Sequence, residues 1–183
     1  MIMGSLLMQE VSRQKERIRA MLEERQRNTV PKAVTGTQRV DLRLVGHTSF
    51  EAKTGAFNLV VDEPGDRGGT GLGPAPLNYF LLGAASCLMM QYARISIAEG
   101  VPLDSLEMTG RGHVDKRRGG SYFEMIYDIR IQSGESPERI LMLARDSEEF
   151  CYVHQTLNKS VRLITNVNLN GKLVGSLVTG PDT

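Results

Sequence analysis

The pattern of apolar residues divides the chain into helical and extended segments. Apolar positions recur at helical spacing in residues 5–28, as a thin stripe among charged side chains, and far more densely in residues 76–99. Elsewhere apolar and polar residues alternate, which is typical of strands with one wet face. The predicted order is a helical arm, a β meander, a long helix, a hairpin, a second helix, a short helical turn and a final hairpin.

Turn residues set several boundaries of these elements. The meander turns at Thr54-Gly55 and the first hairpin at the run 117–120, which reads RRGG. Ser136 before Pro137 predicts the N-cap and first turn of the second helix. The final hairpin reverses at Asn170-Gly171.

The long helix is predicted to run from Pro76 to Glu99. Proline suits the first turn of a helix, whereas Gly100 can take a left-handed cap conformation and Pro102 cannot continue the helix. Its surface is apolar around most of the circumference, which is more than one small sheet can cover. A strip of small residues on this helix would let another helix or chain pack closely against it; the strip consists of Gly83, Ala84 and Cys87. We therefore expect an obligate homodimer.

Residues 62–76 are rich in glycine and proline and are predicted to form a loop. The run GGTGLG superficially resembles a phosphate cradle. However, no GK[ST] follows it, and its spacing differs from the GxGxxG of dinucleotide-binding proteins. A plain loop explains these glycines better.

Composition bounds the class of protein. The chain has 183 residues, with 22 Lys plus Arg against 21 Asp plus Glu and a net charge of +1, so one domain or a compact pair is expected rather than a dedicated nucleic-acid binder. The first eight residues lack a basic leader, and the apolar stretch from Leu77 to Met90 falls short of the ~20 residues that cross a bilayer. We expect a cytoplasmic protein that binds neither nucleic acid nor a membrane.

Residues 1–33 are predicted to form a helical arm and residues 34–183 the main domain. The arm holds seven basic and four acidic residues, which could indicate RNA or membrane contact but is more typical of a solvated helix face. Its thin apolar stripe is expected to contact the partner subunit; it includes Leu7, Val11, Ile18 and Leu22.

Several chemistries lack the residues they need. His47, His113 and His154 are far apart in sequence and there is no CxxC, so neither a metal site nor a cofactor is expected. There is no GxSxG, and Ser86 lies within an apolar helix instead of at an exposed turn.

The two cysteines leave two interpretations open. Cys87 lies in the middle of the long helix, and Cys151 follows 64 residues later (151 minus 87), at the start of the short helical turn. A free cysteine often behaves as a small buried hydrophobe, so inert packing is one interpretation. Redox chemistry is the other.

Two segments together resemble the osmotically inducible protein C and organic hydroperoxide resistance (OsmC-like) superfamily. The first joins Asp62-Glu63-Pro64, the glycine-rich loop and the proline-initiated helix with its mid-helix cysteine; the second is the run CYVHQTL at 151–157. The resemblance covers roughly residues 36–180 and leaves out the arm. It implies an α+β fold with antiparallel sheets around long central helices, in an intertwined dimer.

The resemblance also implies a thiol peroxidase that reduces organic hydroperoxides without a cofactor. Cys87 would be the peroxidatic cysteine and Cys151 the resolving one, and an external dithiol would reduce their disulfide. For this mechanism the two cysteines must lie close together. His154 could hydrogen-bond the Cys151 sulfur, although packing is the simpler role. Glu148 and Glu149 would raise the pKa of Cys151, whereas a helix start would lower it.

The chain departs from the superfamily at one position. Where members carry a glutamate near the start of the cysteine helix, this chain has Leu77 and Asn78. In members of the superfamily this glutamate holds an arginine by a charge-assisted hydrogen-bonded pair. The candidates for that arginine here are Arg39 and Arg43 on the early strand, and less favourably Arg67 in the glycine-rich loop. The alternative function is therefore a catalytically weak or inactive member that binds a small apolar ligand or senses oxidants.

Overall fold

The computed structural model describes residues 13, 15–21, 23–24, 27, 37–118 and 120–181. The chain forms two compact units, residues 31–83 and residues 1–30 with 84–183, so the boundary falls inside the long helix α2 (Pro76–Glu99). The end of the arm predicted near Pro31, and the arm residues Leu7, Val11 and Leu22, lie outside the described residues.

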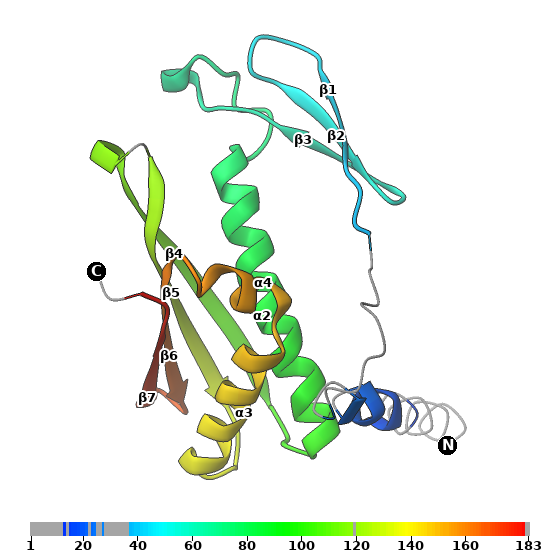
Figure 1. Cartoon of the computed structure of the whole chain (residues 1–183), viewed down its shortest axis with the longest axis vertical. Coiled ribbons are helices and arrows are strands. Elements are labelled where there is room, and N and C mark those ends of the chain that lie inside the picture. Colours follow the sequence, from blue (N-terminus) through cyan, green and yellow to red (C-terminus); the bar gives the residue numbers. More distant parts are fainter. Residues whose placement is uncertain are drawn as a thin grey trace. The chain divides into compact units, whose positions relative to one another are not determined.

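The unit of residues 31–83 contains the predicted meander. Strands β1 (Asp41–Leu44), β2 (Phe50–Thr54) and β3 (Phe57–Val61) pair antiparallel in that order, followed by the 3-10 turn η1 (Gly65–Arg67) (Figure 1). Directly paired residues share a face of a sheet, so Leu42, Ala52 and Leu59 form one apolar row. Leu42 remains 62% exposed, so the described chain leaves much of this apolar face uncovered.

The glycine-rich loop is organised by the buried carboxylate of Asp62. That carboxylate accepts hydrogen bonds from the Thr48 hydroxyl, from the Thr70 hydroxyl and N–H, and from the N–H groups of Glu63 and Leu72. The Thr70 hydroxyl is the largest cause that holds the pKa of Asp62 well below its usual value, against the opposing effect of burial.

Two glycines of this loop are required by close approach of the chain to itself. A Cβ at Gly69 would lie 1.7 Å from the Glu63 carbonyl oxygen, and one at Gly73 would lie 2.2 Å from the Val60 carbonyl oxygen. The glycines therefore let the loop fold back around the Asp62 carboxylate. This agrees with the expectation that GGTGLG forms a loop and not a phosphate-binding site.

The second unit is built on a four-stranded sheet. Strands β4 (Ser105–Asp115) and β5 (Ser121–Gln132), joined by η2 (Lys116–Arg118), form one antiparallel hairpin, and β6 (Arg162–Leu169) and β7 (Lys172–Thr179) form the other. The order is β4-β5-β6-β7, and the hairpins join through a parallel pairing of β5 with β6. Both hairpins are antiparallel, as predicted, and the parallel pairing that joins them is an addition that alternation of apolar residues does not reveal.

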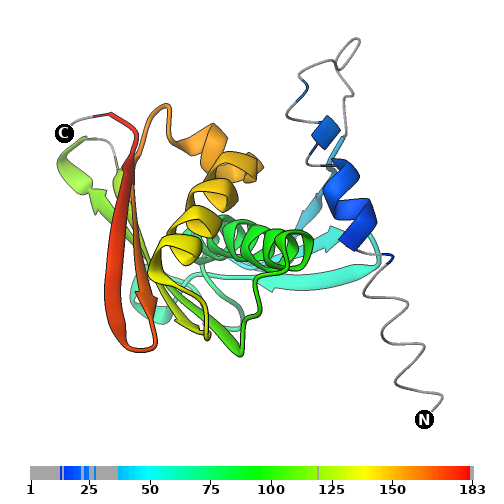
Figure 2. The same ribbon diagram turned by 90° about the horizontal axis from the view of Figure 1, so that it is seen from below.

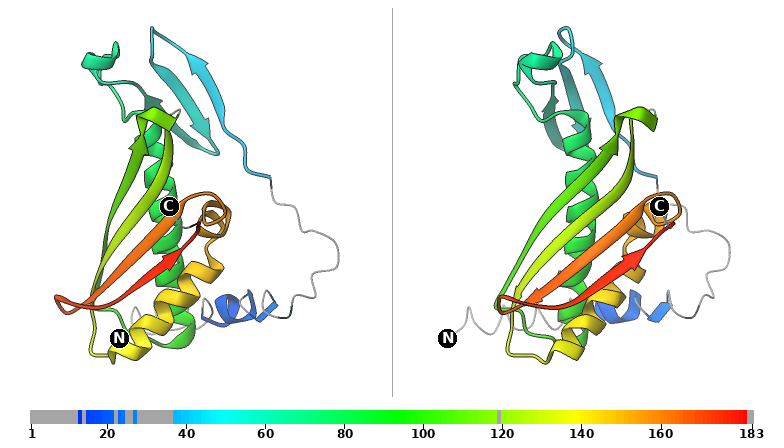
Figure 3. Two further views of the ribbon diagram at one scale, coloured as in Figure 1. Left: turned by 60° about the vertical axis from the view of Figure 1, so that its left-hand side comes forward. Right: turned by 90° about the vertical axis from the view of Figure 1, so that its left-hand side faces the viewer.

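Two helices connect β5 to β6, namely α3 (Pro137–Phe150) and α4 (Tyr152–Leu157). Ser136 caps α3 by accepting the Arg139 N–H, with Pro137 in the first turn as predicted. Figures 2 and 3 show α3 and the long helix on the same face of the sheet. The side chains buried between these layers form the core; they include Leu88, Tyr92, Ile95, Met125, Ile129, Ile131, Ile140, Leu143, Leu163 and Val167.

Helix α2 has the predicted bounds, and Gly100 follows it with a left-handed φ of 66°. By length and composition alone α2 could cross a membrane. The apolar stretch from Leu77 to Met90 was expected to be too short for this, but the helix continues to Glu99. Leu88 and Ile95 are each 1% exposed, so one side of α2 is packed into the core of the protein.

We predict that Asp62→Asn loosens the glycine-rich loop. Asparagine lacks the charge that strengthens these hydrogen bonds, so local opening at Arg67 should rise by about tenfold. Limited trypsin digestion, with mass spectrometry of cleavage after Arg67, measures this opening. Asp66→Asn is the matched control, because Asp66 lies in the same loop on the exposed η1 turn. Equal cleavage of both variants would contradict the role given to Asp62.

Candidate active site

Cys87 and Cys151 lie in contact. Their Sγ atoms are 3.5 Å apart, with Cys87 half-buried in the middle of α2 and Cys151 fully buried. A disulfide has an S–S distance of about 2.05 Å, so this is a pair of free cysteines poised next to each other. Both belong to the second unit.

The break between α3 and α4 places Cys151 at this point. Its N–H donates to the Glu148 carbonyl at the end of α3, and its Sγ accepts the His154 N–H at 3.4 Å at the start of α4. Cys151 thus ends one helix and caps the next, with extended backbone angles of φ −82° and ψ 114°. The predicted short helical turn after Cys151 is confirmed.

Burial dominates the electrostatics of the thiol pair. It raises the pKa of Cys151 to about 12, although the N–H groups of His154 and Val153 act in the opposite direction. Burial also raises the pKa of Tyr127 well above its usual value, and negative charge on either cysteine would raise it further. At neutral pH, therefore, Cys151 is held as a thiol and Tyr127 as a neutral phenol.

A cluster of buried polar side chains lies behind Cys151. His154 Nε2 is 2.8 Å from Thr179 Oγ1 and 3.8 Å from Glu148 Oε2, while Glu148 Oε1, His154 Nδ1 and the Tyr92 hydroxyl form no hydrogen bond in the described part of the chain. The Thr165 hydroxyl lies close enough to lower the pKa of Glu148 but is not aligned as a regular donor. The His154 side chain thus packs into this cluster, and only its backbone contacts Cys151.

Burial moves the pKa values of Glu148 and His154 in opposite directions. It raises the pKa of Glu148 and lowers that of His154 to about 4, so that at neutral pH His154 is uncharged. The sequence offered one signal for this cluster, since Glu148 follows Ile140 and Ala144 at helical spacing on the apolar face of α3. Nothing in the sequence linked it to Tyr92, Thr165 or Thr179.

The candidate activating arginines all form ion pairs within the unit of residues 31–83. Arg39 pairs with Asp41 at 2.7 Å, Arg43 pairs with Glu51, and Arg67 lies 3.5 Å from Glu63. Asp41 and Glu63 are close to their arginines in sequence, and Glu51 lies directly opposite Arg43 on the paired strand β2, an arrangement typical of solvated surface pairs. Leu77 and Asn78 belong to the same unit and are exposed.

The described residues contain no group of three or more His, Cys, Asp or Glu side chains arranged as metal ligands. The contact between the two sulfur atoms supports thiol chemistry at this site. A half-buried cysteine on a core helix, in contact with a buried cysteine from the crossover between two parallel strands, defines an α+β protein with a dithiol site.

This chain belongs to the OsmC-like protein family. The family model matches residues 69–166, which is more than half of the chain and includes both cysteines. The sequence-based resemblance and the α+β fold class are confirmed.

Solved structures share the fold at low sequence identity. An OsmC-like protein from Mycoplasma pneumoniae has a TM-score of 0.68 at 22% identity, covering 74% of this chain and 99% of its own. An organic hydroperoxide resistance protein OsmC from Legionella pneumophila has a TM-score of 0.61 at 18% identity, covering 75% and 99%. One from Elizabethkingia anophelis has a TM-score of 0.63 at 16% identity, covering 76% and 100%. No curated protein sequence matches this chain significantly.

We predict that His154 makes the protein less stable in mild acid. Because its pKa falls from 6.5 in the unfolded chain to about 4 in the folded one, its stabilising contribution is complete above pH 6.5 and is lost as pH falls towards 4. The loss between pH 7 and pH 4 should be on the order of 2 kcal/mol. Glu148 acts in the opposite sense, since a raised pKa favours the folded state as pH falls.

Urea unfolding followed by circular dichroism at pH 7 and pH 4.5 measures the effect, as the chain has no Trp. His154→Gln keeps an amide that can bond Thr179 but does not titrate, so this variant should lose less stability than the wild type between the two pH values. His47→Gln, a change of an exposed histidine, is the control. An identical pH dependence in all three proteins would contradict the prediction.

Proposed function

We propose that the protein is a thiol peroxidase that reduces organic hydroperoxides through Cys87 and Cys151. The observation that carries the proposal is the 3.5 Å contact between the two sulfur atoms, which come from segments 64 residues apart (151 minus 87). Inert packing does not require two cysteines to meet, whereas formation of a disulfide does.

The exposure of the two thiols assigns their roles in this proposal. Cys87 is half-buried and Cys151 is 0% exposed, so a peroxide reaches Cys87 first. The Cys87 thiolate attacks one oxygen of the peroxide, the O–O bond breaks, and the alkoxide takes up a proton and leaves as an alcohol. Cys87 is oxidised to a sulfenic acid.

Cys151 then resolves the sulfenic acid. Its sulfur attacks Cys87 Sγ to form the S–S bond, the S–O bond breaks, and the hydroxide leaves as water with the proton of the Cys151 thiol. The sulfur atoms need to move from 3.5 Å to about 2.05 Å, which is a local change at the α3–α4 junction. An external dithiol, the proposed reductant, returns both cysteines to thiols by exchange.

Family membership supports a peroxide-related redox role. The relatives from Legionella pneumophila and Elizabethkingia anophelis are named as organic hydroperoxide resistance proteins. The α2 sequence around Cys87 is apolar, with Leu88 and Met89 directly after it, and an apolar site fits an organic substrate better than hydrogen peroxide, which gains little from apolar walls.

We predict different outcomes for the two serine variants. Cys87→Ser should abolish consumption of cumene hydroperoxide, whereas Cys151→Ser should be oxidised once and stall at the sulfenic acid or proceed to sulfinic acid. Dimedone labelling with mass spectrometry distinguishes these states, and dithiothreitol supplies turnover in the wild type. Near-normal turnover by both variants would contradict the proposal. Wild-type oxidation to the disulfide without turnover would instead favour an oxidant sensor.

We also propose that the protein works as a homodimer. In the described chain the first half of α2 leaves large apolar side chains exposed, including Leu77 at 45%, Phe80 at 44% and Leu82 at 60%, and a second copy would cover such a face. Sedimentation at micromolar concentration should give about twice the 20.2 kDa chain mass, and dilution should lower the melting temperature. A folded, fully active monomer would contradict this proposal.

A further inference from the structure

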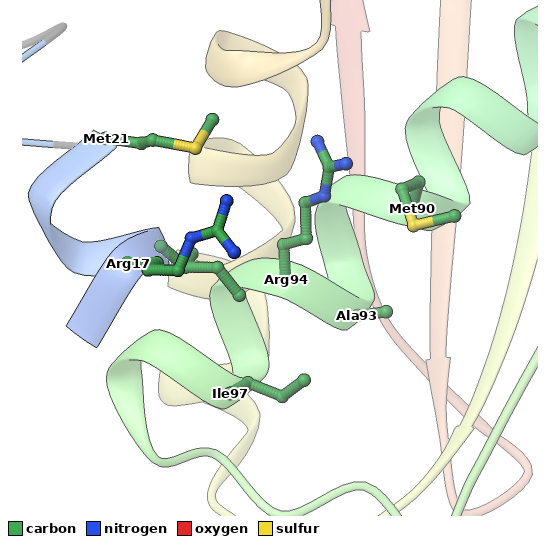
Figure 4. Close-up of a pocket in the computed structure, with 7 residues that line it drawn as sticks. Arg17, Met21, Met90, Ala93, Arg94 and Ile97 are labelled. Atoms are coloured by element: carbon green, nitrogen blue, oxygen red, sulfur yellow. The ribbon is translucent and has the colours of Figure 1, made fainter. Parts of the chain in front are cut away.

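A pocket separate from the cysteines lies between α2 and the first helix. That helix, here called the arm helix, is described at residues 13, 15–21, 23 and 24. The cavity between the two helices has a volume of about 340 Å³, within the roughly 300–1,000 Å³ of small-molecule sites. Its lining is Arg17, Ile18, Met21, Met90, Ala93, Arg94 and Ile97, and Figure 4 shows this arrangement.

A hydrogen bond from Arg19 links the arm helix to the carboxyl end of α2, where an arginine of α3 also binds. Arg19 Nε donates to the Ala98 carbonyl oxygen at 2.6 Å, and Arg139 from α3 donates to the carbonyl oxygens of Glu99 and Gly100. Cations are favourable at a helix C-terminus, because its last carbonyl groups lack intrahelical partners. The arm helix and the final turns of α2 therefore belong to a single compact unit and together form the walls of the pocket.

Two positive charges face this pocket without a counter-charge. Neither Arg17 nor Arg94 forms a hydrogen bond or ion pair with any described residue, in contrast to Arg19 and to Arg27, which pairs with Glu23 at 3.1 Å. In Figure 4 the Arg17 and Arg94 side chains come from different helices and extend in the same direction. Two guanidinium groups on one pocket repel each other unless an anion lies between them.

The other walls of the pocket are apolar. Met21 and Met90 are 50% and 52% exposed, and Ile18, Ala93 and Ile97 are half-buried beside them. Methionine side chains are flexible and adapt to ligands of varied shape. The pocket thus combines a site for one planar anionic group with a surface for an alkyl chain.

We propose that this pocket binds an amphiphilic carboxylate, with the carboxylate between Arg17 and Arg94 and the alkyl chain against Met21, Met90 and Ile97. A carboxylate suits the site because each guanidinium can donate two parallel N–H groups to it. Neither cysteine lines the pocket, so this binding is independent of the proposed peroxidase activity.

Titration of the full chain, labelled with 13C at the methionine methyl groups, tests the proposal with decanoate as the probe. The signals of Met21 and Met90 should shift saturably, while that of Met125, which is 0% exposed in the core, should not. Octanoate should bind more weakly than decanoate by two- to fourfold for each methylene removed. Decanol and decyltrimethylammonium, which keep the chain but lack the negative charge, should bind at least about tenfold more weakly.

Arginine variants test the charge directly. Arg17→Gln and Arg94→Gln should each weaken decanoate binding by about tenfold or more, whereas Arg145→Gln, on exposed α3 surface outside the pocket, should leave it unchanged. Equal affinity of the double variant, or of decanol in the wild type, would overturn the proposal. So would Met21 and Met90 signals that move with protein concentration alone and do not respond to decanoate, because a second copy would then occupy the pocket.

Discussion

The parallel pairing of β5 with β6 is the constraint on which the site depends. Parallel neighbours cannot be joined by a tight turn, so the chain must cross from the end of one strand to the start of the other. Here residues 133–161 make that crossing as α3 and α4. Packing of Ile140, Leu143 and Ala144 holds the crossover on the sheet face that also carries α2, and Cys151 lies at the break between α3 and α4. The two sulfur atoms meet because two hairpins are joined in parallel.

Burial then gives two chemically identical side chains different properties. Cys151 lies in a medium of low polarity that disfavours its thiolate, and the α4 N–H groups compensate only in part. Cys87 retains access to solvent on the side of α2. A buried neutral thiol does not compete for a peroxide, yet it remains in contact with the sulfur that would be oxidised. In the proposed mechanism this difference in solvent access is enough to order the two steps.

Local signals in the sequence predicted the elements well but not their long-range pairing. Pro76 and Gly100 bound α2 because proline fits a first turn and glycine adopts the left-handed cap, and Asn170-Gly171 marks a hairpin for the same conformational reason. Alternation cannot distinguish parallel from antiparallel neighbours, so the β5–β6 pairing was missed. The contact between Cys87 and Cys151 was expected only from family resemblance, since no spacing rule joins residues 64 apart (151 minus 87). The role of Asp62 was missed because three of its hydrogen bonds come from backbone N–H groups, which any sequence supplies, and no spacing rule links it to the hydroxyls of Thr48 and Thr70.

The wide apolar circumference of α2 also explains why one helix carries both the thiol site at its middle and the proposed pocket nearer its carboxyl end. Successive residues of a helix are about 100° apart, so the side that includes Ala84, Leu88 and Ile95 packs into the core while Met90, Ala93 and Ile97 lie on the side away from it. The fold of the unit needs only the first side to be apolar. Apolar residues on the second side would reduce solubility without adding to the core, unless something covers them. Arg94 on that side, aligned with Arg17 of the arm helix, favours a charged amphiphile over a purely apolar cover.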